Sequence, residues 1–308
     1  MSERQPASIR EVSPDEAGRR LDNYLTTLLG GVPRALVYRI IRSGEVRVNG
    51  RRAQAAQRIE AGDKVRVPPF IPPDAAAPQI GRGIKDTVEA AVLFEDEHLM
   101  ALNKPSGLAV HGGSGLPFGV VDVVRAIRPD EPRIELVHRL DRETSGCLLL
   151  AKNGRTLREL HSQLRDGGMR KSYLALLWGR LPAGAIRCAA PLQMVPDGNG
   201  ERHAVVSSEG NDARSEFRGR QWYAEWTLTD VEIDTGRTHQ IRAHAAHLGH
   251  PVAADTRYAE PSIYEQGRGL GLRRMFLHAA VLEFEHQGRR QLEAPLPDDL
   301  AALVSRLV

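Results

Sequence analysis

The sequence is short of cysteine, and this shortage excludes two classes of protein. Its two cysteines, Cys147 and Cys188, lie far apart and match neither a disulfide framework nor a cysteine-based metal site. A chain without disulfides belongs by default in a reducing compartment, so we expect a cytoplasmic protein.

Long apolar runs are missing as well. No run approaches the roughly 20 residues that a membrane-spanning helix needs. The first residues, Met1 to Pro6, hold no apolar segment of the kind found in signal peptides. We therefore expect no membrane partner. Hydrophobic residues still make up 41% of the 308 and charged residues 26%, which is ordinary for a protein with a full core.

Aromatic residues are scarce, at 5%, and this argues against a sugar-binding enzyme. Asp141 and Glu143 stand at i and i+2 on an extended segment, so they point the same way and lie too close together to flank a glycosidic bond. The chain has no Gly-x-Ser-x-Gly nucleophile elbow. The glycines near Gly112 lack the Gly-Lys-Ser/Thr sequence of a phosphate loop.

One polar stretch near the middle of the chain, residues 137–146, stands between two apolar runs. A loop held between two strands often carries functional side chains. His138, Arg139 and Asp141 fall within four residues of one another, which a charged surface turn does not explain.

The N-terminal part, residues 1–68, has the features of a small domain. Apolar residues at i, i+3, i+4 and i+7 predict a helix over 20–29, and a second apolar face predicts another that ends at Ser43-Gly44. Asn49-Gly50 predicts a two-residue hairpin turn. A last strand is expected through Val65 and Val67.

This N-terminal part is strongly basic. Eleven basic and four acidic residues lie between Gly18 and Pro68, a net charge of +7, and since the whole chain is +3 the remainder is −4. A compact, arginine-rich module beside a nearly neutral body indicates contact with a phosphate backbone, the alternative being a solvated basic surface. The candidate RNA-binding residues are Arg20, Arg34, Arg39, Arg42, Arg47, Arg51 and Arg52.

Residues 69–87 are expected to form a flexible linker, because their prolines, alanines and glycines leave little that packs. The large domain is then expected over 88–308. It should begin with two short strands over 91–94 and 99–102, after which Lys104 is a candidate for contact with a polyanion.

Further along the chain, a helix is expected over 155–164 and a strand over 171–178. Tyr173 in that strand is either a half-buried aromatic or a ring that faces a base. A later strand leads into residues 235–244, where Thr238 is a plausible helix N-cap. His239 and Arg242 crowd that helix N-terminus, where anions are favoured.

Histidines recur in this region, since His244, His247 and His250 are three apart. No cysteine or carboxylate completes a tetrahedral set and no His-Glu-x-x-His pattern exists, so we expect no metal site.

Five motifs follow one another along the chain, at residues 103–107, 138–141 with 144–146, 171–173, 236–242 and 276–279. In this order they resemble the motifs of the RluA-type pseudouridine synthases, and the N-terminal part resembles the S4 RNA-binding domain. The resemblance extends from about residue 18 to 307. Within the family, residues 31–33, 111–115 and 118–120 are similar to the synthases of large-subunit ribosomal RNA.

The resemblance implies an α+β fold, in which a mixed, largely antiparallel sheet with flanking helices follows a small S4-like α/β domain. It also implies isomerisation of uridine to pseudouridine in 23S ribosomal RNA, without metal or small-molecule cofactor. We assume that the protein is a monomer. Asp141 matches the catalytic aspartate, and Arg242 the arginine that pairs with it and favours its ionised form.

Other residues receive supporting roles from the same resemblance. Tyr173 matches the aromatic that stacks on the uracil, and Ile241 is expected to pack against the base. Arg139 matches the arginine that fills the space of the flipped-out nucleotide. His138, Lys104 and His239 are further candidates for substrate contact. Two alternatives stay open: the same chemistry on transfer RNA or other ribosomal sites, and a non-catalytic ribosome-assembly factor.

Overall fold

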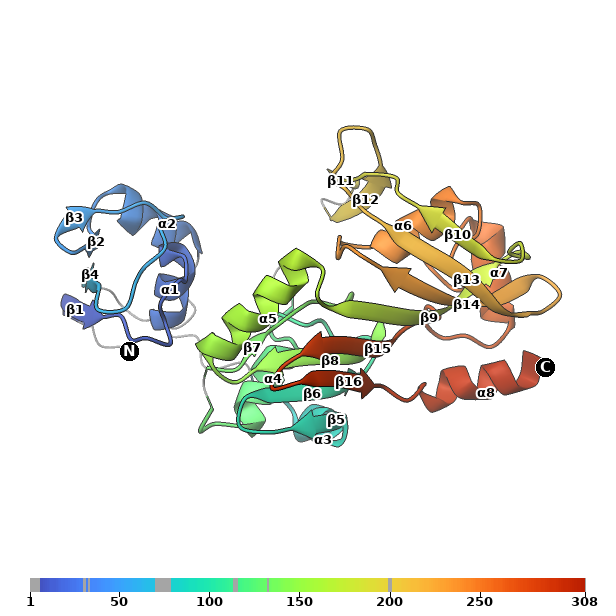
Figure 1. Cartoon of the computed structure of the whole chain (residues 1–308), viewed down its shortest axis with the longest axis horizontal. Coiled ribbons are helices and arrows are strands. Elements are labelled where there is room, and N and C mark those ends of the chain that lie inside the picture. The colour runs from blue at the N-terminus through green and yellow to red at the C-terminus, as the bar shows by residue number, and fades with distance from the viewer. Residues whose placement is uncertain are drawn as a thin grey trace. The chain divides into compact units, whose positions relative to one another are not determined.

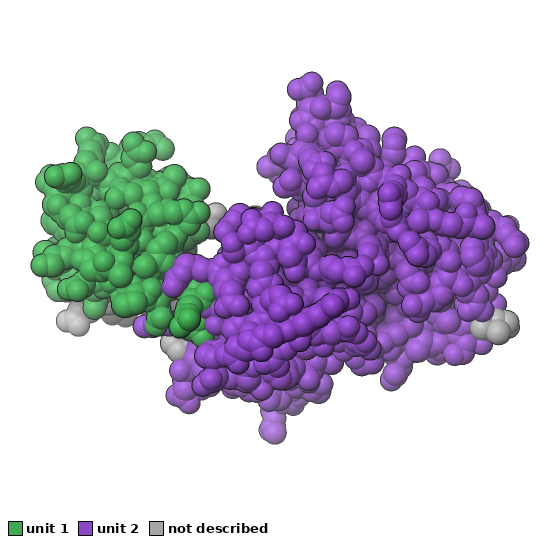
Figure 2. Space-filling model, in the orientation of Figure 1, with its two compact units in different colours: residues 1–79, 153–155 green, residues 80–152, 156–308 purple. Residues whose placement is uncertain are grey.

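The computed structural model describes residues 6–29, 32, 34–69, 79–112, 116–131, 133–198 and 201–307, and of Arg34 only the backbone. The chain divides into two compact units, residues 1–79 with 153–155 and residues 80–152 with 156–308 (Figure 2). Each unit has its own hydrophobic core.

The first unit packs two helices against a small sheet of strand order β1-β4-β2-β3. Leu21, Leu25 and Val37 are fully buried in its core, which confirms the two apolar faces read from the sequence. Asn49 and Gly50 both have positive φ angles, 51° and 77°, as a two-residue hairpin turn requires. The elements are β1 (Ser8–Glu11), α1 (Leu21–Leu28), α2 (Arg34–Arg42), β2 (Arg47–Val48), β3 (Arg51–Arg52) and β4 (Lys64–Val67).

The predicted linker is wrong in its second half. Helix α3 (Arg82–Ala90) occupies most of it, and both Ile80 and the fully buried Val88 pack into the core of the second unit. The sequence did not indicate this helix, because Gly81 and Gly83 lower helix propensity at its start. The helix is also short, so few residues make up its apolar face. Residues 70–78 lie outside the described part, so the flexibility of that segment stays a prediction.

The second unit is built on one large sheet of strand order β10-β13-β14-β9-β15-β8-β6-β5, to which β16 and β7 add at β15 and β8 (Figure 1). All the pairings are antiparallel except β8 with β15, which confirms the predicted mixed, largely antiparallel α+β fold. Its strands are β5 (Val92–Glu95), β6 (Leu99–Lys104), β7 (Glu135–Leu136), β8 (Ser145–Ala151), β9 (Arg170–Trp178), β10 (Ala185–Cys188), β13 (Ser215–Trp222), β14 (Trp226–Ile233), β15 (Leu277–Glu285) and β16 (Arg289–Glu293).

Strand β8 is buried on both faces. Leu148 and Leu150 belong to one core cluster, and the alternate residues Cys147 and Leu149 belong to another. Helix α4 (Val120–Ile127) contributes to the first cluster, and Leu160 of α5 (Gly154–Asp166) to the second. A continuous apolar run is what a strand covered on both faces requires.

The rest of the second unit extends from the β9–β14 half of the sheet. The hairpin of β11 (Leu192–Pro196) and β12 (Arg202–Val206) projects from the body of the unit (Figure 1). Helices α6 (Gln240–His247), α7 (Pro261–Gly269) and α8 (Asp298–Leu307) complete the unit, and none of the described helices is long and apolar enough to cross a membrane.

One row of residues runs across the middle of the sheet and links the central motifs. Ala279 of β15 stands opposite Gly146 of β8 on one side and Tyr173 of β9 on the other, and Tyr173 in turn faces Val231 of β14. A Cβ atom on Gly146, whose φ is 115°, would overlap with the backbone of Ala279. Glycine therefore lets β8 approach β15 at this point.

Candidate active site

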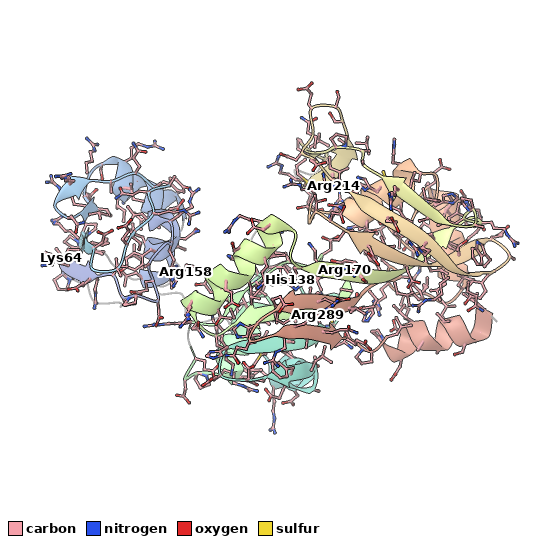
Figure 3. The ribbon with its side chains drawn as sticks, viewed as in Figure 1. Lys64, His138, Arg158, Arg170, Arg214 and Arg289 are labelled. Atoms are coloured by element: carbon pink, nitrogen blue, oxygen red, sulfur yellow. The ribbon has the colours of Figure 1, made fainter. Side chains whose placement is uncertain are left out.

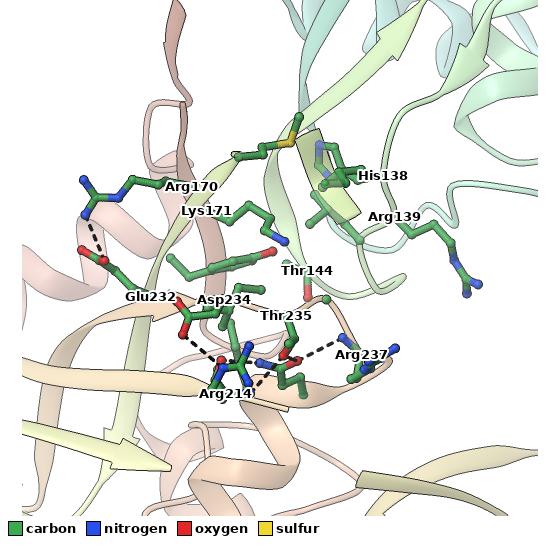
Figure 4. Close-up of a pocket in the computed structure, with 18 of the residues that line it drawn as sticks. His138, Arg139, Thr144, Arg170, Lys171, Arg214, Glu232, Asp234, Thr235 and Arg237 are labelled. Carbon is green, nitrogen blue, oxygen red and sulfur yellow. Dashed lines mark hydrogen bonds and ion pairs between the residues drawn. The ribbon is translucent and has the colours of Figure 1, made fainter. Parts of the chain in front are cut away.

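A cavity of about 930 Å³ lies where the loop before β8, strand β9 and the β14–α6 connection meet. Its lining includes Arg139, Asp141, Lys171, Tyr173 and Arg242, which come from all three segments (Figure 4). Three of the residues labelled in Figure 3, His138, Arg170 and Arg214, also line the cavity and belong to different parts of the chain. Residues separated by about a hundred positions thus share one pocket.

Asp141 and Arg242, the predicted catalytic pair, are brought together. Arg242 Nη1 lies 3.4 Å from Asp141 Oδ2, and the carboxylate keeps 23% of its side chain exposed to the cavity. Arg242 itself is only 7% exposed. The geometry leaves one face of a paired carboxylate open to a ligand.

Asp255, which the sequence analysis did not select, holds Arg242 in place. Arg242 donates from Nε to Asp255 Oδ2 at 2.7 Å and from Nη2 to Oδ1 at 2.8 Å. Burial would lower the pKa of Arg242, but the hydrogen bonds and charge of Asp255 outweigh burial and raise that pKa. The sequence contained a signal for this role. Asp255 directly follows the apolar residues 252–254, which indicates burial, and a buried aspartate requires a cationic partner.

Asp255 also orders the turn that follows it. The backbone N–H groups of Arg257 and Tyr258 donate to its Oδ1 at 2.9 and 3.2 Å. The Tyr258 ring lies under the Arg242 guanidinium, with 5.0 Å between Arg242 Cζ and the ring centroid. Arg257 forms ion pairs with Asp197 and Glu201 at the β11–β12 hairpin, so the same turn holds both Arg242 and that hairpin.

Tyr173 and Ile241, the residues predicted to contact a base, both belong to the apolar part of the cavity wall. They are 8% and 4% exposed. Burial, and then the negative charge of Asp141, raise the pKa of Tyr173. Its phenol is therefore protonated at neutral pH, which suits a stacking surface better than a base.

His239 lies beside Asp141, but Thr238 is not the helix N-cap. His239 takes that position with a left-handed backbone, φ 54°, and makes no side-chain cap bond. Its Nε2 lies 3.9 Å from Asp141 Oδ2 and its Nδ1 3.0 Å from the Tyr258 hydroxyl. Burial lowers the pKa of His239, so a neutral imidazole faces the carboxylate.

Lys104 does not face the cavity, and its predicted contact with a polyanion is wrong. It is fully buried, and its Nζ donates to the carbonyls of Pro105 and Leu108 at 2.8 Å and of Arg142 at 3.1 Å. Burial lowers the pKa of Lys104 to about 7. Its place is behind the loop that carries Asp141, where it joins two segments of backbone.

Two further bonds join the same segments. Ser106 Oγ donates to the Glu143 carbonyl at 2.7 Å, and Gly107 N donates to the Arg142 carbonyl at 2.9 Å. The run 103–107 therefore fixes the loop after Asp141 from behind.

His138, a predicted substrate contact, lines the cavity and also binds the backbone of β8. Its Nε2 accepts a hydrogen bond from the Leu149 backbone at 3.2 Å, which anchors the loop to β8. Burial, together with the charge of Lys171, lowers the pKa of His138 to about 4, so the ring is neutral. Arg139, the next residue, is exposed at the cavity, as a side chain that meets RNA must be.

Lys171 is a cavity residue that the sequence analysis missed. It is 9% exposed and precedes Tyr173 by two positions on β9, so both side chains point to the same face of the strand. The signal was available, because alternation along the predicted strand places Lys171 beside Tyr173.

The basic residues of the first unit lie mostly on its surface. Arg20 is half-exposed and pairs with Asp22, Nη2 to Oδ2 at 2.7 Å. The side chain of Arg34 lies outside the described part, so its role in RNA binding stays a prediction. The exposed members of the predicted set are Arg39, Arg42, Arg47, Arg51 and Arg52.

The histidines at 244 and 250, which the sequence places near one another, bind different parts of the structure. His244 is buried, with Nδ1 at 2.9 Å from Ser215 Oγ and Nε2 at 2.9 Å from the Ala190 carbonyl. His250 Nδ1 binds the Trp178 carbonyl at 2.7 Å. Within the described ranges no three His, Cys, Asp or Glu side chains are grouped to hold a metal ion.

Comparison with known proteins gives two family matches. The RNA pseudouridylate synthase family matches residues 98–247, and the S4 domain matches residues 19–65.

Curated relatives match the whole chain. Ribosomal large subunit pseudouridine synthase C of Escherichia coli strain K12 is 45% identical over 99% of this chain and 98% of its own. The protein of the same name from Yersinia pestis is 47% identical over 94% and 92%.

Among solved structures, human RNA pseudouridylate synthase domain containing 4 is similar in fold, with a TM-score of 0.61 at 22% identity, over 73% of this chain and 95% of its own.

Proposed function

Because the chain belongs to the RNA pseudouridylate synthase family, we propose that it converts specific uridines of 23S ribosomal RNA to pseudouridine. The assignment to the large-subunit RNA is supported by relatives named for that activity, which are 44 to 47% identical over at least 94% of this chain. One observation of the site supports this chemistry most directly. The Asp141 carboxylate is partly exposed to the cavity and lies 3.4 Å from the buried guanidinium of Arg242.

The reaction moves one bond and needs neither an oxidant nor a hydrolytic water. The bond from C1′ of the ribose to N1 of uracil breaks, the base turns, and a bond from C1′ to C5 forms while the C5 proton is lost and N1 gains one. Asp141 acts as a carboxylate, and Arg242 Nη1 lies 3.4 Å from its Oδ2. Whether Asp141 attacks C1′, attacks the base or removes a proton from C2′ stays open.

The other groups bind and place the nucleotide. A uridine inside a helix has to be flipped out, which costs a few kcal/mol. Exposed Arg139 stacks in the vacated space, where a planar cation meets both bases and phosphates. Tyr173 and Ile241 then hold the uracil between an aromatic and an aliphatic surface.

The first unit recruits the RNA. Its exposed arginines on α2 and on the β2–β3 hairpin contact phosphates, a kind of binding that fixes position without reading sequence. No metal or small-molecule cofactor is part of the proposal. A monomer in the cytoplasm, where ribosomal RNA is modified, remains the expected form.

The test is a single substitution with a matched control. Asp141→Asn keeps the size of the side chain and removes its charge, so pseudouridine formation in 23S RNA should fall below detection while RNA binding survives. Glu143→Gln, at a half-exposed carboxylate two residues away, should retain activity. Pseudouridine formed by Asp141→Asn at the wild-type rate would refute the mechanism.

Mapping pseudouridines in total RNA with and without the gene then identifies the substrate. Loss confined to transfer RNA sites would refute the 23S assignment, and no loss at any site would favour the assembly factor.

A further inference from the structure

Lys171 is a buried cation for which the proposed chemistry has so far no use. It is 9% exposed, and it lines the cavity, where Figure 4 shows its extended side chain among the other lining residues. Its Nζ lies 3.6 Å from where a Cβ on Gly236 would stand, so the ammonium rests against the connection between β14 and α6.

The ammonium has no hydrogen-bond acceptor among the side chains and backbone groups that the structure describes. The nearby charge of Asp234 favours its protonated form, but burial is the larger effect and lowers the pKa of Lys171. Lys104 provides the comparison within the same unit, because its fully buried ammonium is satisfied by three carbonyls. Lys171 instead lines the cavity, so a ligand in the cavity is the natural acceptor for its ammonium.

The depth of Lys171 shows which part of an RNA it meets. Its exposure, 9%, is close to the 8% of Tyr173 two positions along the same strand, so both lie at the level of the base. The cations that a phosphate backbone would meet at the cavity mouth are the exposed Arg139, Arg165 and Arg170. An ammonium offers only donors, and the acceptors of uracil are its two carbonyl oxygens.

We propose that Lys171 donates a hydrogen bond to a carbonyl oxygen of the flipped uracil and stabilises the negative charge that the base takes up as its glycosidic bond breaks. The electron pair of the C1′–N1 bond passes to N1 and spreads onto the carbonyl oxygens. Lys171 stays protonated and transfers no proton. A fixed donor aimed at developing charge in a water-poor site is an effective form of catalysis. This inference deepens the proposed function and rests on it.

The experiment compares Lys171→Met and Lys171→Arg with wild type on 23S RNA isolated from a strain that lacks the gene. Lys171→Met should lower the single-turnover rate at saturating enzyme by about 100-fold, as loss of one such donor does. The dissociation constant for the RNA should change little. Lys171→Arg, which keeps the charge, should recover part of the rate. Lys85→Met, which removes a lysine of α3 outside the cavity, serves as the control.

Thio-substituted transcripts test the contact itself, because sulfur accepts hydrogen bonds poorly. Replacing uridine by 2-thiouridine or 4-thiouridine should slow wild type at one of the two positions, and Lys171→Met should lose that sensitivity. An equal penalty in both enzymes would overturn the proposal.

Two other results would also overturn it. One is a full single-turnover rate in Lys171→Met. The other is weaker binding with a salt slope reduced by about one unit, which indicates a phosphate contact instead. Thermal unfolding of each variant separates these results from misfolding. Failure of the proposed function is distinguishable, since wild type itself would then form no pseudouridine in 23S RNA.

Discussion

Arg242 stays charged although it is buried, because Asp255 accepts two of its hydrogen bonds and is itself 1% exposed. Removing one partner of a buried ion pair leaves the other charge uncompensated. Asp255→Asn should therefore lower the free energy of unfolding by about 3–5 kcal/mol and reduce activity, because Arg242 loses its fixed position beside Asp141. Urea denaturation and the pseudouridine assay measure the two effects.

The control for this substitution is a surface pair of the same kind. Asp230 pairs with Arg220 at 3.0 Å, and both side chains are more than 40% exposed. Asp230→Asn should change stability by less than about 1 kcal/mol. If Asp255→Asn were as stable and as active as Asp230→Asn, the role given to Asp255 would be wrong.

His138 makes stability depend on pH. Its pKa is about 4 in the folded protein, below the usual 6.5, because of burial. Between pH 6.5 and pH 4 the unfolded chain binds a proton that the folded chain does not, so this contribution is lost as the pH falls through that window. A difference of this size corresponds to about 3 kcal/mol.

The matched variant is His138→Gln, whose side-chain oxygen still accepts a hydrogen bond but does not titrate. Unfolding measured from pH 4 to 7 should decline less steeply with falling pH in His138→Gln than in wild type. Parallel curves for the two proteins would show that His138 does not titrate as argued.

At the scale of elements, the contact between β8 and β15 depends on Gly146. A side chain at this position meets the Ala279 backbone and also adopts a φ of 115°. Gly146→Ala should therefore unfold at a much lower temperature than wild type and lose activity, because the loop that carries Asp141 leads directly into this strand.

Gly184→Ala separates the two causes. Gly184 has a similar φ, 97°, but no atom lies within 4 Å of the added methyl group. It should cost only the backbone strain, about 1–3 kcal/mol. A Gly146→Ala protein no less stable than Gly184→Ala would show that β8 and β15 can separate slightly at no cost.

Elements whose pattern is local were predictable from the sequence. Helix α5 carries Leu157, Leu160 and Leu164 on one face, and the Asn49-Gly50 turn has its own chemistry, so both appeared as expected. Helix α3 was missed because two glycines and a neighbouring proline-rich run conceal its apolar residues.

Pairings between distant strands were not predictable. Nothing local indicates that β15 stands between β8 and β9, since register depends on partners far away in the chain. The same limit applies to the two lysines. Lys104 and Lys171 both belong to a recognisable motif, and only the tertiary structure shows that one binds backbone carbonyls while the other faces the cavity.

At the scale of the whole molecule, the basic first unit should govern how RNA binding responds to salt. Replacing Arg39, Arg47 and Arg51, which are all exposed, by glutamine should lower the slope of log K against log salt by about 2, since each phosphate contact contributes roughly 0.7–0.9. Filter binding to 23S RNA at several salt concentrations measures the slope.

An equal change of charge elsewhere is the control. Arg187, Arg218 and Arg220 on β10 and β13 are exposed and paired with Glu216 or Asp230. Their replacement by glutamine should leave the slope within about 0.5 of wild type, because paired arginines do not neutralise phosphates. Equal slopes for the two triple variants would contradict the interpretation that the first unit binds the RNA.

Strand β15 also sets the order in which the enzyme becomes complete during its own synthesis. Strand β8, which follows the loop of Asp141, and strand β9, which carries Tyr173, leave the ribosome early. They are joined in the sheet only through β15, residues 277–285, which lies between them. Until that late segment emerges, β8 and β9 have open edges and the cavity lacks Leu277 from its wall. A nascent chain is therefore inactive until nearly all of it has been translated, so pseudouridine formation by unfinished chains is not expected.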